Sequence, residues 1–142
     1  MNNIINLYTD GSSRGNPGPG GWGVVLVWND YRKELSGGAP QTTNNRMELT
    51  AVIEGLRAIK KKEYTVHIYS DSSYVVNAIN LGWLSKWVAK GFKKKNEDLW
   101  REYISVAKDF KELKYHWIKG HAGHPENERC DRMAFEQASL YV

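Results

Sequence analysis

Hydrophobic and polar positions in the N-terminal part of the chain predict three strands. The buried-type residues Ile4, Ile5, Leu7 and Tyr8 predict a strand over about residues 3–12. The run WGVVLVW (22–28) is rich in β-branched and aromatic residues and predicts a second strand, with YRKELSGG (31–38) as its hairpin partner. Between the first and second strands, the segment SRGNPGPGG (13–21) holds two prolines and four glycines and predicts a turn without regular structure.

The pattern then changes to helical spacing. A helix is predicted to begin near Thr43, where Thr43, Asn44 or Asn45 can cap it; its apolar stripe is Leu49, Val52, Ile53, Leu56 and Ile59. The remaining elements are a strand in YTVHIYSD (64–71), a short serine-capped helix in SSYVVNAINLGW (72–83), a helix in EDLWREYISVAKDF (97–110), a strand in LKYHWIKGH (113–121) and a helix in PENERCDRMAFEQASL (125–140). This order predicts an α/β fold, with a five-stranded mixed sheet flanked by helices.

Size and composition favour a folded domain with an anionic partner. The 142 residues are expected to form one domain, residues 1–142, with a substantial core. The formal net charge is +4, which favours a polyanion such as nucleic acid. With one cysteine, no apolar run of membrane-spanning length and no recognisable signal peptide, the chain is expected to be a cytoplasmic monomer without membrane association.

Four acidic residues stand where an acid is hard to explain structurally. Asp10 and Asp71 each close an apolar run, Glu48 lies beside the apolar stripe of its helix, and Asp131 follows Cys130 in the last helix. If the first and fourth strands are parallel neighbours, Asp10 and Asp71 stand side by side, where a cation would relieve their repulsion. Mg²⁺ prefers such oxygen ligands, and two ions can act together on a phosphodiester. The structural alternative is that each acid is an ordinary turn, cap or surface residue.

Histidines in the segment GHAGHPENE (120–128) are a second group of candidates. His121 and His124 lie in a predicted loop, where an imidazole can exchange protons near neutral pH or have no role. A zinc site from His116, His121, His124 and Cys130 is a further alternative, although its spacing matches no standard motif.

Glycine-rich nucleotide motifs are not indicated. Gly18, Gly20 and Gly23 satisfy the pattern GxGxxG, but they precede a predicted strand instead of a helix. No GxxxxGK[ST] motif is present, so no nucleotide cofactor is expected.

A basic stretch interleaved with aromatic residues follows residue 82. Its lysines can neutralise phosphates and its aromatic rings can lie against sugars and bases, or the stretch can be an amphipathic helix with its tryptophans inward. The residues are Trp83, Lys86, Trp87, Lys90, Phe92, Lys93, Lys94, Lys95 and Trp100.

Four sequence blocks, in family order, resemble ribonuclease H, type I, in its bacterial single-domain form. The blocks are YTDGSSRGNPGPGGWG, TTNNRMEL, SDSSYVV and KGHAGHPENERCDRMA. The resemblance implies an endonuclease that hydrolyses the RNA strand of RNA–DNA hybrids with two Mg²⁺ ions (or Mn²⁺), leaving 5′-phosphate and 3′-hydroxyl ends.

The resemblance also implies roles for individual residues. The metal-ligating carboxylates fall on Asp10, Glu48, Asp71 and Asp131, and the mobile-loop histidine of the family falls on His121. Residues implied to contact the hybrid are Ser13, Asn16, Thr43, Asn44, Asn45, Ser73, Trp83, Lys86, Trp87, Lys90, Lys93 and Lys94. At Ser13 and Ser73, many bacterial members carry Cys and Gln instead. A catalytically silent hybrid-binding module and a related DNA nuclease of the same fold remain the alternative functions.

Overall fold

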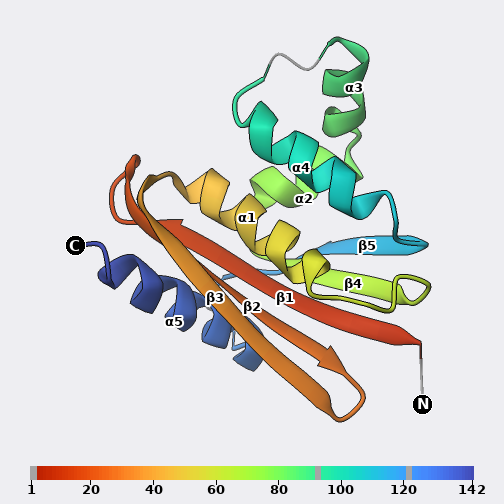
Figure 1. Ribbon diagram of the computed structural model, residues 1–142, viewed down its shortest axis with the longest axis horizontal. Coiled ribbons are helices and arrows are strands. Elements are labelled where there is room, and N and C mark those ends of the chain that lie inside the picture. The colour runs from red at the N-terminus through yellow and green to blue at the C-terminus, as the bar shows by residue number, and fades with distance from the viewer. Residues whose placement is uncertain (1–2, 92–93, 121–122) are drawn as a thin grey trace.

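A five-stranded mixed sheet forms the centre of the computed structural model, which describes residues 3–91, 94–120 and 123–142. Figure 1 shows the strands in the order β3-β2-β1-β4-β5. The antiparallel part consists of β1 (Ile4–Ser13), β2 (Gly18–Trp28) and β3 (Tyr31–Thr42), and the parallel part adds β4 (Thr65–Ser70) and β5 (Glu112–Trp117) beside β1. The predicted mixed α/β architecture is therefore confirmed.

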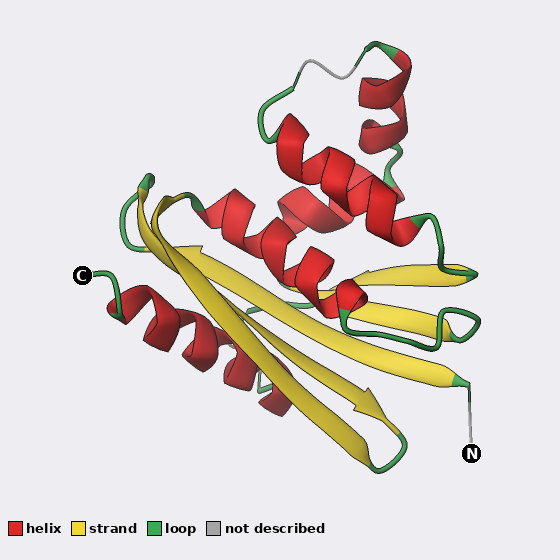
Figure 2. Cartoon of the chain, viewed as in Figure 1, coloured by secondary structure: helices red, strands yellow, loops and turns green. Residues whose placement is uncertain are grey.

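Helices cover both faces of this sheet (Figure 2). One face carries α1 (Asn44–Arg57), with α2 (Ser73–Asn80), α3 (Trp83–Ala89) and α4 (Glu97–Ala107) beyond it. The other face carries α5 (Pro125–Ser139), which packs on β1, β2 and β3. Among the described residues, no helix is both long and apolar enough to cross a bilayer.

The main hydrophobic core lies between the sheet and α1, where Leu7, Leu49, Val52, Leu56 and Ile68 are almost completely buried. Helical spacing places Leu49, Val52 and Leu56 on one face of α1, as the sequence predicts. The Thr43 hydroxyl caps this helix by accepting a hydrogen bond from the Arg46 N–H at 3.2 Å. The start of α1, which carries Glu48, is thus fixed by both its cap and its buried face.

On the opposite face, α5 approaches the sheet closely because β2 is rich in glycine. A Cβ atom at Gly21 would lie 2.2 Å from the Ala134 carbonyl oxygen, and one at Gly23 would lie 2.5 Å from the Cys130 carbonyl oxygen. Only glycine permits this approach of helix backbone to strand. The close packing holds α5, and Asp131 with it, against β1 and β2.

Several strand boundaries differ from the prediction: β3 continues beyond residue 38 to Thr42, β5 ends at Trp117, and the first two strands differ as well. The predicted turn over 13–21 is shorter, because β2 begins at Gly18 and β1 continues to Ser13. Ser12 and Ser13 pair with Gly21 and Gly20, so the glycine-rich segment is held extended by its partner strand. Asp10 consequently lies inside β1 and does not end it.

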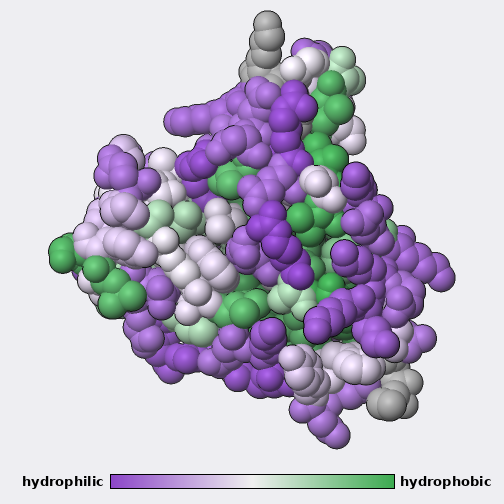
Figure 3. All heavy atoms as spheres, in the orientation of Figure 1, coloured by the Kyte–Doolittle hydropathy of each residue, from purple (hydrophilic) through white to green (hydrophobic). Residues whose placement is uncertain are grey.

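Exposed hydrophobic side chains gather at the C-terminus. Leu140, Tyr141 and Val142 are all exposed. Figure 3 shows a hydrophobic area at this end of the molecule, with hydrophilic residues over much of the rest of the visible face.

Candidate active site

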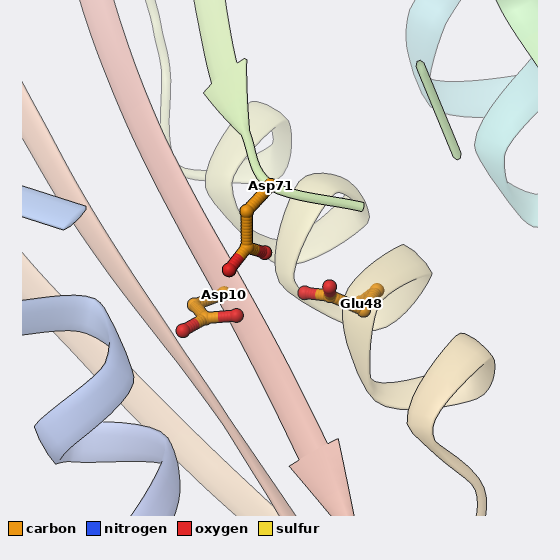
Figure 4. Close-up of side chains that lie close together, drawn as sticks. All are labelled: Asp10, Glu48 and Asp71. Carbon is orange, nitrogen blue, oxygen red and sulfur yellow. The ribbon is translucent and has the colours of Figure 1, made fainter. Parts of the chain in front are cut away.

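Three carboxylates meet where the parallel part of the sheet ends. Asp10, Glu48 and Asp71 each offer an oxygen atom, and these atoms all lie within 4.8 Å of one another. Figure 4 shows the three side chains converging from β1, from the start of α1 and from the residue after β4. The predicted side-by-side arrangement of Asp10 and Asp71 is confirmed.

Strand register and a glycine at position 11 bring the three acids together. The parallel ladder between β1 and β4 ends at the pair Thr9 and Ser70. Asp10 and Asp71 are the residues that directly follow this pair in the chain. Gly11 then lies against α1, where a Cβ atom would be 2.3 Å from the Met47 carbonyl carbon and 2.4 Å from the Glu48 nitrogen. This contact lets the helix place Glu48 beside the two aspartates.

Burial and mutual repulsion make the ionised cluster unfavourable. Burial, and next the charge of Asp71, raises the pKa of Asp10 to about 8, although the Gly11 N–H donates to its Oδ1 at 2.9 Å. Burial, and next the charge of Asp10, raises the pKa of Glu48 well above its ordinary value. The Glu48 Oε1 atom is buried and has no hydrogen-bond partner among the residues that the structure describes. Such a site gains stability from a bound cation.

The donor set suits a hard divalent cation. All three side chains supply oxygen, which Mg²⁺ and Mn²⁺ accept, and the buried Oε1 of Glu48 has no hydrogen bond among the described residues to compete with a cation. The residues present therefore fit the metal that the family resemblance implies.

The zinc alternative has no support among the residues that the structure describes. The Nε2 atom of His116 lies 2.7 Å from Nδ1 of His67, and the Cys130 thiol donates to the Tyr8 carbonyl oxygen at 3.3 Å. Within the described ranges, the acidic trio is the one cluster of three or more potential His, Cys, Asp or Glu ligands.

Asp131 lies at the edge of the same cleft, outside the trio. The half-buried Asp131 extends from α5, and its charge contributes to the raised pKa of Asp10. The cleft measures about 390 Å³ and is open to solvent on one side. Its lining consists of Asp10, Gly11, Ser12, Asn44, Asn45, Glu48, Asp71, Ser72, Ser73, Tyr74 and Asp131.

Three of the predicted substrate residues, Ser13, Asn16 and Asn44, form one hydrogen-bonded group at the start of α1. Asn44 accepts hydrogen bonds at Oδ1 from the Ser13 N–H (2.6 Å) and the Ser13 hydroxyl (3.2 Å). The Asn44 N–H donates to Asn16 Oδ1 at 3.2 Å, which joins the β1–β2 turn to α1. Thr43 caps the helix, while Asn45 and Ser73 line the cleft. The structure thus brings these predicted residues to the border of the acidic trio.

Trp83, Lys86 and Trp87 of the basic stretch lie in α3, above α4 in Figure 1, and Trp100 lies in α4. Trp87 packs on the core and meets Trp100 edge-on, with ring centroids 6.0 Å apart, whereas Trp83 is 39% exposed. Lys86, Lys90 and Lys94 are exposed. The inward orientation expected of an amphipathic helix is therefore seen for Trp87, whereas Trp83 keeps an exposed ring. Lys93 and the predicted proton-transfer residue His121 lie outside the described residues.

One partly buried network near the cleft was not predicted. The Tyr74 hydroxyl accepts hydrogen bonds from Asn96 Nδ2 (3.2 Å) and Trp100 Nε1 (2.8 Å). Arg46 reaches both Asn96 Oδ1 (3.3 Å) and the Asp98 carboxylate (2.7 Å). This network ties α1 and α2, which border the cleft, to the start of α4. It joins residues far apart in sequence, and the cap-like position of Asn96 was the only local signal.

Comparison with known proteins agrees with this geometry. The family model described as RNase H matches residues 2–139. A protein named ribonuclease H from Desulforamulus reducens is 52% identical over 140 residues, covering 94% of this chain and 87% of its own length. The chain belongs to the ribonuclease H family.

Solved structures share the fold. The crystal structure of LC9-RNase H1, titled a type 1 RNase H with the type 2 active-site motif, superposes with a TM-score of 0.88 at 32% identity, covering 100% of this chain and 75% of the other. LC11-RNase H1, solved in complex with an RNA/DNA hybrid, gives a TM-score of 0.71 at 27% identity and covers 96% of this chain and 97% of its own.

Proposed function

We propose that the protein is an endonuclease that hydrolyses the RNA strand of RNA–DNA hybrids and leaves 5′-phosphate and 3′-hydroxyl ends. The observation that carries this proposal is the convergence of Asp10, Glu48 and Asp71 within 4.8 Å. Membership in the ribonuclease H family and the hybrid in the LC11-RNase H1 structure support the choice of substrate. A catalytically silent binding module is less consistent with the site, because unneutralised carboxylates would repel the phosphates of a bound strand.

The metal ligands are proposed to be the trio together with Asp131, which would hold two Mg²⁺ ions, or Mn²⁺ in their place. Bound ions would supply Lewis-acid chemistry, activating water for attack on the phosphodiester and stabilising the leaving 3′ oxygen. The raised pKa values of Asp10 and Glu48 support this assignment, since both carboxylates are held where only a cation or a proton relieves their charge. Asp131, which lines the cleft, would extend the site toward a second ion.

The protein's own residues would orient the substrate and move protons. His121, which the family resemblance assigns to a mobile loop, is proposed to exchange a proton during turnover or to assist product release. The hydrogen-bonded group of Ser13, Asn16 and Asn44 is proposed to contact the minor groove with Thr43, Asn45 and Ser73. Amides and hydroxyls there can recognise the 2′-hydroxyl that distinguishes RNA from DNA.

The exposed face of α3 is proposed to bind the DNA strand. Lys86, Lys90, Lys93 and Lys94 would neutralise its phosphates, and Trp83 would lie against a sugar, with Trp87 supporting it from the core side. These contacts depend on backbone and sugar shape, so cleavage is expected to show little sequence preference.

A substrate panel tests the proposal. Purified protein is incubated with end-labelled RNA–DNA hybrid, duplex RNA, duplex DNA and single strands, with Mg²⁺, with Mn²⁺ and with chelator. Cleavage confined to the RNA strand of the hybrid and abolished by chelator is the expected result. Efficient cutting of duplex DNA would instead identify a DNA nuclease of the same fold, and binding without cleavage would identify a silent module.

The remaining features of the proposal concern assembly and location. One domain spanning residues 1–142 is proposed to act as a monomer in the cytoplasm. Light scattering of the purified protein, with and without hybrid, tests the monomer.

A further inference from the structure

Among the three converging acids, Asp71 has the least local support. Asp10 lies within β1 and Glu48 within α1, but Asp71 follows the end of β4 and precedes α2. The position of Asp71 therefore depends on the contacts that other segments make with residues 70–72.

The end of β5 holds this short connection through two hydrogen bonds. The Trp117 indole Nε1 donates to the main-chain carbonyl oxygen of Asp71 at 3.0 Å, and the Ile118 N–H donates to the Ser70 carbonyl oxygen at 2.9 Å. Ser70 and Trp117 are also the last residue pair of the β4–β5 ladder. The carbonyl groups of Ser70 and Asp71, one on each side of the Asp71 Cα atom, are thus both hydrogen-bonded to the end of β5.

Trp117 provides this bond from an exposed position. The residue is 54% exposed, so hydrophobic burial explains little of why a tryptophan stands there. Its indole N–H, by contrast, has a specific acceptor in a residue of the acidic trio. Trp117 therefore contributes mainly its indole N–H donor, and its ring contributes little buried area.

Gly120 leaves room for the Asp71 carboxylate, because it has no side chain. A Cβ atom at position 120 would lie 2.8 Å from Asp71 Oδ2, which is closer than real Cβ contacts allow. Because the contacted atom is the end of a flexible side chain, an added methyl group would push the carboxylate aside more than it would disturb the fold.

From these contacts we infer that Trp117 and Gly120 are positioning residues for the Asp71 carboxylate. Trp117 acts through its indole bond to the Asp71 main chain, and Gly120 acts by leaving space beside Asp71 Oδ2. Together they set how tightly a divalent cation is held by the trio. The inference rests on the proposed function only in taking Asp71 as a metal ligand.

Metal binding to the free protein tests this directly. Mn²⁺ is titrated into wild type, Trp117→Phe and Gly120→Ala, and unbound Mn²⁺ is followed by electron paramagnetic resonance. Each variant should raise the dissociation constant by about tenfold, a size typical for outer-shell partners of metal ligands. Trp117→His keeps a ring N–H and should recover part of the loss. With hybrid, kcat at limiting Mn²⁺ should fall while KM for the hybrid stays within about twofold.

The matched control is Trp28→Phe, the same change at a tryptophan of the distant β2–β3 hairpin, which should bind Mn²⁺ as wild type does. Circular dichroism gives the folded fraction of each protein. Unchanged dissociation constants, or losses that merely follow the unfolded fraction, would overturn the inference. Weakened Mn²⁺ binding in a protein whose wild type cleaves no hybrid would support the positioning role while rejecting the proposed function.

Discussion

Asp10 and Asp71 stand side by side because the residues before them, Thr9 and Ser70, form the last pair of the parallel β1–β4 ladder. The pairing places two carboxylates at one edge of the sheet, and Glu48 closes the group from α1. Asp10 is 5% exposed, so it has little water to offset the neighbouring charges. A metal-binding role gives this arrangement a physical reason.

Replacing Asp10 by Asn should abolish turnover without abolishing substrate binding. The amide keeps the size of the side chain but removes the charge that a cation requires, so we expect hybrid cleavage to fall by at least about a thousandfold. Affinity for the hybrid in the absence of metal should be retained or improved, because one negative charge facing phosphate is lost. Single-turnover cleavage and fluorescence anisotropy measure the two quantities. Substantial residual cleavage would remove Asp10 from the proposed metal site.

The same residue should make the metal-free protein less stable as the pH rises. The folded-state pKa of Asp10 is about 8, above its ordinary value of 3.8. The folded protein therefore holds this proton more tightly than the unfolded chain does, and the associated stability is complete below about pH 4 and lost as the pH rises toward 8. The raised pKa of Glu48 acts in the same direction.

Urea denaturation between pH 5 and pH 8, with chelator present, measures this effect. The free energy of unfolding of wild type should decline over the range, and one pKa unit corresponds to about 1.4 kcal/mol. Asp10→Asn should show a shallower decline and greater stability at pH 8. Added Mg²⁺ should stabilise wild type more than the variant. A pH-independent difference between the two proteins would contradict the assigned pKa.

Local patterns in the sequence were sufficient to predict α1, α2, α4 and α5, whereas α3 was only one of two alternatives for the basic stretch. Thr43 was one of three candidate caps for α1, and a serine cap was predicted for α2; Thr43 and Ser72 accept the expected backbone hydrogen bonds. The acids were also recognisable, because an ionisable side chain beside an apolar run has few structural explanations. Asp10 and Asp71 could be placed together once the two strands were taken as parallel neighbours.

Features that depend on contacts between distant segments could not be predicted in this way. The glycine-rich start of β2 resembles a turn locally, but pairing with β1 and close packing of α5 hold it extended. The Tyr74–Asn96–Arg46 network and the Trp117 bond to Asp71 likewise join residues whose proximity arises only in the folded chain. Asp131 lies beside the trio and not within it, a distinction that no spacing along the sequence reveals.

Adding a methyl group at Gly11 should separate α1 from the sheet. The Cβ atom of Gly11→Ala would overlap the Met47 backbone at 2.3 Å, and a backbone atom cannot rotate away. We expect a loss of about 1–3 kcal/mol in the free energy of unfolding. Cleavage per folded molecule should also fall, because Glu48 moves with the helix. Gly55→Ala, on the α1 side of the same sheet–helix contact, is the control, since its Cβ would meet the flexible end of Leu7 at 2.9 Å. Equal effects of the two variants would argue against the backbone contact.

The lysines of α3 should affect substrate affinity more than chemistry. Lys86 and Lys90 are exposed and do not line the cleft of the acidic trio, so the double variant Lys86→Ala, Lys90→Ala should raise KM for the hybrid with little change in kcat. The slope of log affinity against log salt should become shallower by up to about two, one for each lost phosphate contact. The control removes the same charge at Lys60 and Lys61, which lie after α1 near Ile5 and Trp28. If both double variants change the slope equally, the protein attracts the hybrid through overall charge, and α3 has no dedicated role.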